Sequence, residues 1–225
     1  MGFYVTFDGV SGSGKGSLIR RLEVRLKNAG KSVAVLEDNR IDPLRGYGSR
    51  IVSWCERYGI NSSEFLLPLF SVGNALADEA LRDALASHDV VLRDRSFITS
   101  LGYRPALCSI TADQVWDLCV DALGVKVPDA AVLVDCDPSE ATRRVQRRTD
   151  HVDIGFGGKM TTDRAGQEKL REAFLRIPQL FSEKLPVLVI ENSEAFTQDE
   201  AEITRRLEGL CDVVLRFCVM RGLVL

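Results

Sequence analysis

The chain has 225 residues, of which 45% are hydrophobic and 27% are charged, and its formal net charge is −3. This composition is typical of a globular protein with room for one α/β domain, and it gives no reason to expect nucleic acid as the main partner. The six cysteines show no C-x-x-C spacing and the chain has only two histidines, so a zinc site is not expected. We expect reduced, buried thiols in a cytoplasmic protein without a signal peptide or a membrane-spanning segment.

Short apolar, β-branched segments alternate with helical stretches along the chain. The predicted strands are Phe3–Phe7, Ser32–Leu36, Val90–Leu92, Ala130–Val134 and Pro186–Ile190. The predicted helices are Ser17–Asn28, Ser63–Ala86, Thr111–Leu123, Ser139–Arg147, Ala165–Phe181 and Asp199–Phe217. This alternation predicts a doubly wound, three-layer α/β/α fold with five parallel strands. We interpret residues 1–225 as a single domain with a helical tail at about 199–225, whose apolar part, Cys211–Leu225, packs on the domain or covers a subunit interface.

A phosphate loop follows the first predicted strand and leads into the first predicted helix. Its sequence matches G-x-x-x-x-G-K in the strand–loop–helix setting that this motif requires. Glycines let backbone N–H groups converge on one anion, the helix N-terminus adds positive potential, and Lys15 adds a mobile charge. Gly16 stands where Ser or Thr usually follows the lysine, so we expect Mg²⁺ to be held largely through water. The residues predicted to bind ATP are Gly9, Val10, Ser11, Gly12, Ser13, Gly14, Lys15, Gly16 and Ser17.

Three predicted strands lead into the carboxylates Asp8, Asp94 and Asp135. Ligands of open α/β sheets bind at the carboxyl ends of the strands, so these side chains are candidates for function. Asp94 can hold Mg²⁺ through water, with Ser17 as a second candidate ligand, and Arg95 can bind phosphate with two hydrogen bonds. A structural salt bridge is the alternative interpretation of the charges at residues 94 and 95.

An arginine-rich helix end and a glycine-rich segment follow the fourth predicted strand. Arg143, Arg144, Arg147 and Arg148 form two i,i+4 pairs, and one of these pairs can equally be a solvated charged face. We interpret the segment at about 148–164 as a lid. Such a lid closes over the phosphates that react, neutralises their charge and excludes water.

These features, in this order, resemble the nucleoside monophosphate kinases, and the thymidylate kinases most closely. The stretches that carry the resemblance are Phe7-Asp8-Gly9 with the phosphate loop, Leu69-Phe70-Ser71, Asp94-Arg95-Ser96 continuing to Thr99–Tyr103, and Val127-Pro128-Asp129 leading to Leu133–Pro138. The resemblance implies a fold of the P-loop NTPase type and ATP-dependent phosphoryl transfer to a nucleoside monophosphate, with dTMP as the expected acceptor, Mg²⁺ as cofactor, and a homodimer.

The resemblance also implies roles for individual residues. Lys15, Asp94 and Arg95 would take part in catalysis, with Arg147, Arg148, Lys159 or Arg164 supplying the cation of the lid. Phe70 would stack on the acceptor base, Ser100 and Tyr103 would line the base and sugar pocket, and Arg95 would contact the acceptor phosphate. The residues predicted to bind the acceptor are Asp8, Glu37, Phe70, Asn74, Arg95, Ser100 and Tyr103.

The acceptor side departs from the pattern of these kinases. Asn74 stands where they usually carry an arginine that grips the monophosphate, and Glu37-Asp38-Asn39-Arg40 replaces Arg-Glu-Pro. Ser11 replaces a carboxylate that often meets the sugar hydroxyl. The loss of two cations should weaken monophosphate binding, since each charge-assisted hydrogen bond is worth on the order of 1.5–3 kcal/mol.

Two other functions therefore stay open at this point. One is a deoxynucleoside kinase, in which Glu37 or Asp38 acts as a base toward a sugar 5′-hydroxyl. The other is an ATP-binding protein that turns over no acceptor and acts through a partner.

Overall fold

The computed structural model describes residues 1–60, 63–147, 163–194 and 199–225. Its strands are β1 (Phe3–Asp8), β2 (Val33–Glu37), β3 (Val90–Asp94), β4 (Ala130–Asp135) and β5 (Val187–Glu191). They form one parallel sheet in the order β2-β3-β1-β4-β5. The prediction of five parallel strands is confirmed, and each predicted strand agrees with the observed one to within two residues at either end.

The helices are α1 (Lys15–Asn28), α2 (Asp38–Ile41), α3 (Arg45–Tyr58), α4 (Ser63–Ser87), α5 (Phe97–Leu107), α6 (Ala112–Trp116), the π-helical segment η1 (Asp117–Ala122), α7 (Pro138–Gln146), α9 (Arg164–Leu180) and α10 (Glu200–Met220). Three of them, α2, α3 and α5, were not predicted. α5 is buried on nearly all sides, so it lacks the polar face that gives an amphipathic helix its period. None of the described helices is both long and apolar enough to cross a lipid bilayer.

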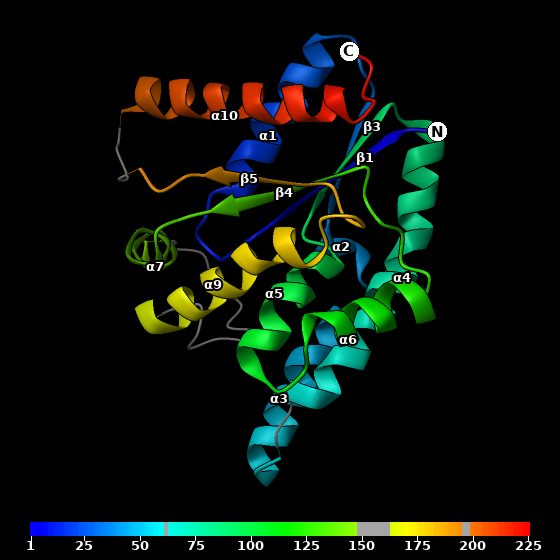
Figure 1. Ribbon diagram of the computed structural model, residues 1–225, viewed down its shortest axis with the longest axis vertical. Coiled ribbons are helices and arrows are strands. Elements are labelled where there is room, and N and C mark those ends of the chain that lie inside the picture. The colour runs from blue at the N-terminus through cyan, green and yellow to red at the C-terminus, as the bar shows by residue number, and fades with distance from the viewer. Residues whose placement is uncertain (61–62, 148–162, 195–198) are drawn as a thin grey trace.

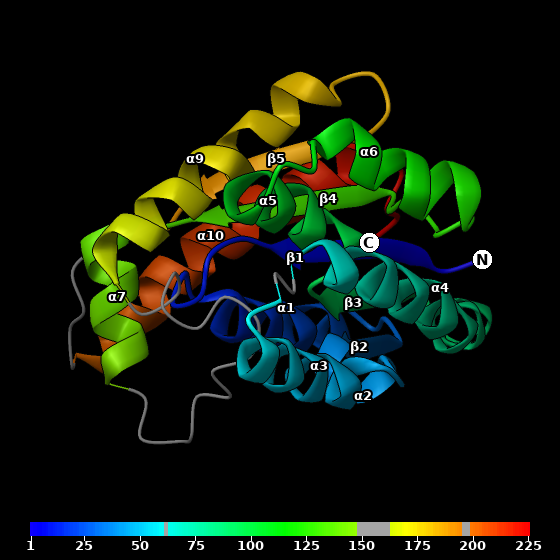
Figure 2. The ribbon, with the colours of Figure 1, turned by 90° about the horizontal axis from the view of Figure 1, so that it is seen from below.

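Helices cover both faces of the sheet, which gives three layers (Figures 1 and 2). α1 and α10 lie side by side on one face, where Leu22 of α1 and Val214 of α10 are buried with the strands. α4, α5 and α9 cover the other face. α10 also buries Cys211 and Cys218 against this face, and the alternative that the tail covers a subunit interface stays a prediction.

The contact between α5 and α9 leaves no room for a side chain at Gly102. A Cβ atom there would lie 2.8 Å from Cδ1 of Phe174. That ring is itself buried and packs edge-on against Tyr103, with 5.9 Å between ring centroids. The α5–α9 contact therefore fixes the helix that follows β3.

We expect Gly102→Ala to lower the free energy of unfolding by about 1–3 kcal/mol, because overpacking a core forces its neighbours to shift. Gly209→Ala is the matched control, since a Cβ at that α10 position meets nothing within 4 Å. The control should be neutral or stabilising by up to about 1 kcal/mol, because alanine favours the helix. Denaturant unfolding of both variants measures the difference, and equal stabilities would contradict the packing argument.

Candidate active site

The phosphate loop has a shape that only glycine permits at three of its positions, Gly9 with φ 135°, Gly12 and Gly14. Gly12 has φ 86° and Gly14 has φ 93°. A Cβ atom would lie 2.3 Å from the carbonyl oxygen of Ala141 at Gly12, and 2.4 Å from Nδ2 of Asn192 at Gly14. The loop therefore packs directly on α7 and on the segment after β5, and α1 begins immediately after it at Lys15.

Lys15 is folded into the loop. Its Nζ donates hydrogen bonds to the carbonyl oxygens of Gly9 at 3.1 Å and Val10 at 2.9 Å, and to Oγ of Ser13 at 3.3 Å. The side chain is buried in spite of its charge. The Lys15 ammonium, which was predicted to lie in a phosphate-binding loop, is thus held close to the backbone of that loop.

Donors from three other elements hold three consecutive carbonyl groups of the loop. Nε2 of Gln167 on α9 donates to Ser11 O at 3.3 Å, and Nη1 of Arg144 on α7 donates to Gly12 O at 3.4 Å. Nδ2 of Asn192, just after β5, donates to Ser13 O at 2.7 Å. A carbonyl and the next N–H point in opposite directions across a trans peptide, so these bonds also fix the direction of the following N–H groups. Such N–H groups are the donors that a phosphate needs, and the one on Ser13 also donates to Val10 O at 3.4 Å in this structure.

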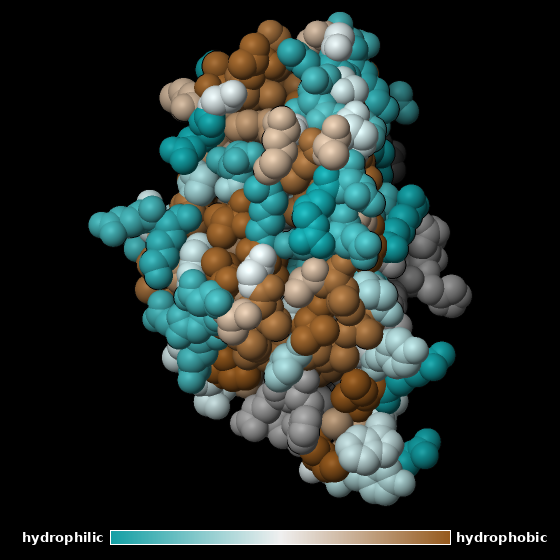
Figure 3. Space-filling view, turned by 90° about the vertical axis from the view of Figure 1, so that its right-hand side faces the viewer, coloured by the Kyte–Doolittle hydropathy of each residue, from teal (hydrophilic) through white to brown (hydrophobic). Residues whose placement is uncertain are grey.

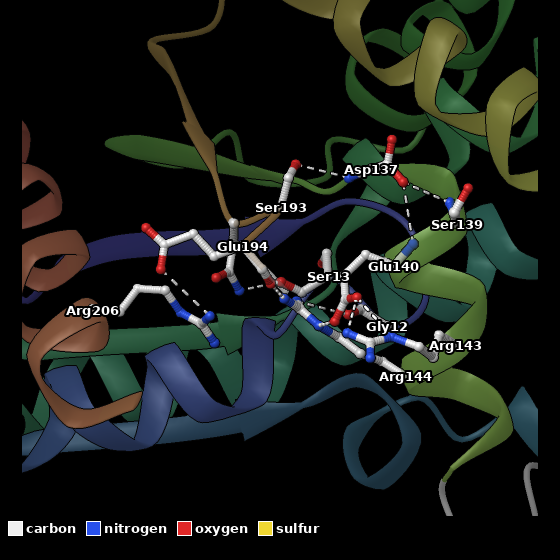
Figure 4. A network of polar contacts seen from close by, with 11 residues as sticks. Gly12, Ser13, Asp137, Ser139, Glu140, Arg143, Arg144, Ser193, Glu194 and Arg206 are labelled. Atoms are coloured by element: carbon white, nitrogen blue, oxygen red, sulfur yellow. Dashed lines mark hydrogen bonds and ion pairs between the residues drawn. The ribbon is translucent and has the colours of Figure 1, made fainter. Parts of the chain in front are cut away.

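Arg144 belongs to a network of polar contacts beside the loop (Figure 4). Glu140 accepts hydrogen bonds from Arg143 and from Nε of Arg144, the latter at 2.7 Å. Burial acts to raise the pKa of Glu140, but the hydrogen bonds from the two arginines outweigh it and the pKa is lowered. Nη2 of Arg144 also donates to Glu194 O at 2.8 Å, and the Glu194 carboxylate pairs with Arg206 at 3.7 Å. Arg144 therefore connects α7 with both the loop and the segment after β5.

The predicted lid is only partly described. Arg148 and residues 149–162 lie outside the described residues. Arg147 is exposed at the C-terminal end of α7. Asp163 caps α9 by accepting a hydrogen bond from Gly166 N at 2.6 Å, and Arg164 pairs with Glu168 at 2.8 Å. The roles given to Arg147 and Arg148 stay predictions.

Arg95 extends across the phosphate loop from the end of β3. Its φ of 70° is the only positive value at a non-glycine position among the described residues. Its N–H donates to Phe7 O at 3.0 Å, and its guanidinium donates to Gly9 O at 3.3 Å and Ser11 Oγ at 3.4 Å. Burial alone would lower the pKa of Arg95, but nearby Tyr103, Asp94 and other acidic groups raise it. A permanent cation thus lies beside the Lys15 ammonium, and both donate to the carbonyl of Gly9.

Asp94 provides a place for a divalent cation. Its Oδ1 is buried and has no hydrogen-bond partner among the described residues. Its Oδ2 lies 4.0 Å from where a Cβ on Gly16 would stand, which is the position where a serine or threonine is usual. No group of three or more metal-ligating side chains gathers within the described part of the chain. One carboxylate fits Mg²⁺, which commonly keeps several waters and binds substrate phosphates.

Two residues of the predicted site, Asp8 and Ser17, form hydrogen bonds with other residues of the chain. Asp8 is fully buried, and its carboxylate accepts hydrogen bonds from Ser96 N and Ser96 Oγ, both at 3.0 Å, and from Thr99 Oγ1 at 2.7 Å. It therefore holds the segment after β3. Ser17 is exposed, and its hydroxyl accepts a hydrogen bond from Arg20 at 3.3 Å. Direct contacts of Asp8 with a substrate and of Ser17 with a metal stay predictions.

The residues predicted to hold the acceptor base come from α4 and α5. Phe70 lies on α4, and the guanidinium carbon of Arg104 on α5 is 5.4 Å from its ring centroid. Burial lowers the pKa of Arg104 to about 10, so this side chain stays charged at neutral pH. Ser100 and Tyr103 are buried on the same helix α5. An aromatic ring, a cation and a hydroxyl-bearing helix are thus brought together.

The remaining predicted residues are Glu37, at the end of β2, and Asn74, on α4. Glu37 is paired across the β2–β3 register with Asp94, and its carboxylate forms an ion pair with Arg40 at 3.1 Å. Asn74 is buried on α4, where its Oδ1 accepts a hydrogen bond from Arg93 at 2.8 Å.

Several residues around the site were not predicted: Arg93, Arg104, Gln167 and Asn192. Two of these had a signal in the sequence. Asn192 follows closely after a predicted strand, where site residues of such sheets gather. Arg93 is a charged residue in a run that otherwise suits burial on both faces. Gln167 and Arg104 had no such signal, because each lies within a helix.

Comparisons with known proteins agree over most of the chain. A family model described as thymidylate kinase matches residues 7–201. A thymidylate kinase of Deinococcus radiodurans is 29% identical over 211 residues, which cover 90% of this chain and 94% of that protein. A thymidylate kinase of Geotalea uraniireducens is 28% identical over 213 residues, with coverages of 91% and 95%. A thymidylate kinase of Bifidobacterium longum subsp. infantis is 25% identical over 222 residues, with coverages of 94% and 91%.

We expect Asn192→Ala to weaken the binding of ATP by roughly 2- to 10-fold, because one hydrogen bond to the loop backbone is lost. Titration calorimetry with ATP and Mg²⁺ measures the affinity. Ser193→Ala is the control, since this hydroxyl accepts from Asp137 N at 2.9 Å and is not bonded to the loop. Equal affinities of the two variants would show that Asn192 does not support the loop.

Proposed function

The chain belongs to the thymidylate kinase family, and from this premise we propose that it transfers the γ-phosphoryl group of ATP to dTMP, forming ADP and dTDP. One observation supports this most directly. Lys15 of the phosphate loop and Arg95 of the segment after β3 both donate to the carbonyl oxygen of Gly9, at 3.1 and 3.3 Å. Two cations from the donor side and the acceptor side thus converge at the point where a phosphoryl group would pass.

The proposed chemistry needs positioning and charge neutralisation more than covalent catalysis. Backbone N–H groups of the loop and Lys15 would hold the phosphates of ATP. Arg95 would neutralise charge on the group in transfer and orient the acceptor phosphate. That phosphate carries the nucleophilic oxygen, so no general base is required. This suits the ion pair of Glu37 with Arg40, which leaves that carboxylate a weaker candidate for a base.

We assign the metal to Asp94, whose buried Oδ1 faces no donor among the described residues. Mg²⁺ bound there would neutralise charge on the ATP phosphates. Since Gly16 has no hydroxyl, the phosphates and waters would complete the coordination. Ser17 would reach the ion only through water.

On the acceptor side, Phe70 would stack on the base, and Ser100 and Tyr103 would line its pocket. Arg147 and Arg148 would supply the cation of a lid over the phosphates. These assignments follow the family resemblance and are supported by the packing of α4 on α5 around Phe70.

We also propose that the enzyme works in the cytoplasm as a homodimer. All six cysteines are free thiols, which supports a reducing compartment. Figure 3 shows hydrophobic residues over much of the lower half of the face where α4 and α6 lie in Figure 1. α4 exposes Val72 and Leu76 by 39% and 50%. Sedimentation analysis separates one chain from two.

The function is tested by coupled ADP release with dTMP, dUMP, dCMP, dGMP, AMP and thymidine as acceptors. We expect stimulation by dTMP and none by thymidine. Glu37→Gln should keep its activity toward dTMP, because the proposed reaction uses no base. Phosphorylation of thymidine alone, lost in Glu37→Gln, would instead identify a deoxynucleoside kinase, and no stimulation by any acceptor would refute the proposed transfer.

The variant Arg95→Gly separates the contribution of the Arg95 side chain to catalysis from the effect of its backbone conformation on stability. Glycine adopts φ 70° without strain, so the free energy of unfolding should stay equal or rise by up to about 1 kcal/mol. The kcat for dTMP should fall by about 100-fold or more, since a cation at the reacting phosphates is lost. Thermal unfolding and steady-state kinetics measure the two effects, and an active variant would contradict the role of Arg95.

A further inference from the structure

Arg93 is a fully buried arginine in the central part of the fold. It lies on β3, directly before Asp94, and its exposed fraction is 0%. Neighbouring side chains of a strand point to opposite faces, so Arg93 and Asp94 serve different sides of the sheet. Arg93 shares its face with Tyr4 and Val91, which pack beneath α4. A cation at such a place must be bound by other groups.

The partners of Arg93 come from three other elements. Its Nη2 lies 2.8 Å from Oδ1 of Asn74 on α4 and 3.5 Å from Oδ1 of Asp38 on α2. Its Nη1 lies 3.5 Å from the hydroxyl of Tyr4 on β1 and 3.6 Å from Oδ1 of Asp78 on α4. The shortest of these contacts goes to the neutral amide and not to either carboxylate. The guanidinium is therefore drawn toward Asn74.

The charge of Arg93 is permanent. Burial would lower its pKa, but Tyr4, Asp38 and Asp78 raise it above the ordinary value. Burial raises the pKa of Tyr4 to about 12, so the phenol keeps its proton. Burial also raises the pKa of Asp78, whose Oδ2 accepts a hydrogen bond from Lys126 N at 2.6 Å. A positive charge at this place is thus maintained throughout the neutral range.

Asn74 connects Arg93 with Phe70, whose ring is proposed to stack on the acceptor base. Its Oδ1 accepts from Arg93, which leaves Nδ2 to donate to the carbonyl oxygen of Phe70 at 2.9 Å, one helical turn earlier. The amide can satisfy both partners in one orientation only. Arg93, Asn74 and the backbone of Phe70 therefore form one connected chain of hydrogen bonds.

We propose that Arg93 is a positioning residue for the acceptor: its guanidinium fixes the amide of Asn74 and, through it, the turn of α4 that carries Phe70. This inference rests on the proposed function of the site. The cation is the Arg93 guanidinium, which belongs to β3 and contacts the side chain of Asn74 on α4. A purely structural ion cluster would affect stability without changing the balance between the two substrates.

Two single variants and their combination test the chain of contacts. Arg93→Met and Asn74→Ala should each raise the KM for dTMP by about 10-fold or more, because a hydrogen bond to a charged group is lost. The KM for ATP should change less than about 3-fold, since the phosphate loop has other supports. The double variant should be no worse for dTMP than Arg93→Met alone, because both changes remove the same contact.

The matched control is Arg25→Met, which also removes an arginine from an ion-paired position. Arg25 connects α1 with α10 through Asp212 at 2.7 Å and Glu208 at 3.1 Å, on the other face of the sheet. Arg25→Met should leave the KM for dTMP unchanged within about 2-fold whatever it does to the unfolding midpoint. The inference is refuted if Arg93→Met resembles Arg25→Met in KM, or if it raises both substrates' KM values equally.

A reciprocal exchange gives the sharpest test. In Arg93→Asn combined with Asn74→Arg, the arginine moves to α4, one turn before Asp78 on the same helical face, where an i,i+4 pair can form. The contact between positions 74 and 93 is kept with donor and acceptor exchanged. The KM for dTMP should return to within about 3-fold of the unmodified protein, whereas Arg93→Asn alone should not recover. Failure of a folded exchange variant to recover would refute a role that depends on this pair.

Other outcomes separate this inference from the proposed function. Absence of acceptor-dependent turnover in the unmodified protein overturns the proposed function, and this inference falls with it. Turnover in the unmodified protein with an unchanged KM for dTMP in Asn74→Ala overturns this inference alone. Asn74→Ala keeps Arg93 with Asp38 and Asp78, so an unchanged KM for dTMP in this variant refutes the inference even if the Arg93 variants do not fold.

Discussion

Hydrogen bonds to the peptide planes of the phosphate loop are the interaction on which the rest of the site depends. The carbonyl groups of Ser11, Gly12 and Ser13 each accept from a different element, so the loop takes its shape from the whole fold. The glycines make this possible, because their positive φ angles let carbonyl groups turn outward toward α7 and the end of β5. A loop held in this way can present its N–H groups to a phosphate without reorganising, which is the physical meaning of preorganisation.

The acceptor side is tied to this loop through the segment after β3. Asp8 accepts three hydrogen bonds from Ser96 and Thr99, and Phe7 O accepts one from Arg95 N. These bonds hold both sides of Arg95 and so maintain its unusual φ of 70°. Backbone strain of this kind persists only where the surroundings over-determine the conformation. Its consequence is the guanidinium over Gly9, next to Lys15.

The sequence predicts what depends on local pattern and fails where contacts span the chain. The five strands and the loop around Lys15 were predictable, because short apolar runs and a glycine-rich turn carry their own signal. α5 was not, because its burial on nearly all sides removes the periodic contrast on which helix prediction depends. Nor were the supports of the loop. Asn192 and Gln167 contact it across 179 and 156 residues of sequence, and only the folded sheet brings them together.

Asn74 stands where related kinases usually carry an arginine, but the absence of a cation at this one position does not show that the surrounding site lacks one. The sequence suggests that the acceptor side lost an arginine, and this favoured an acceptor without a phosphate. The structure places the Arg93 guanidinium 2.8 Å from the Asn74 side chain, reaching it from the strand beneath. Charge acts through space and not along the sequence, so the position of the guanidinium matters more than the element that carries it. Two carboxylates, Asp38 and Asp78, keep this charge bound within the fold and leave Asn74 to carry its effect toward Phe70. The departure at position 74 is therefore compatible with a monophosphate kinase, since Asn74 is bound by a buried cation and in turn holds the turn of α4 that carries Phe70.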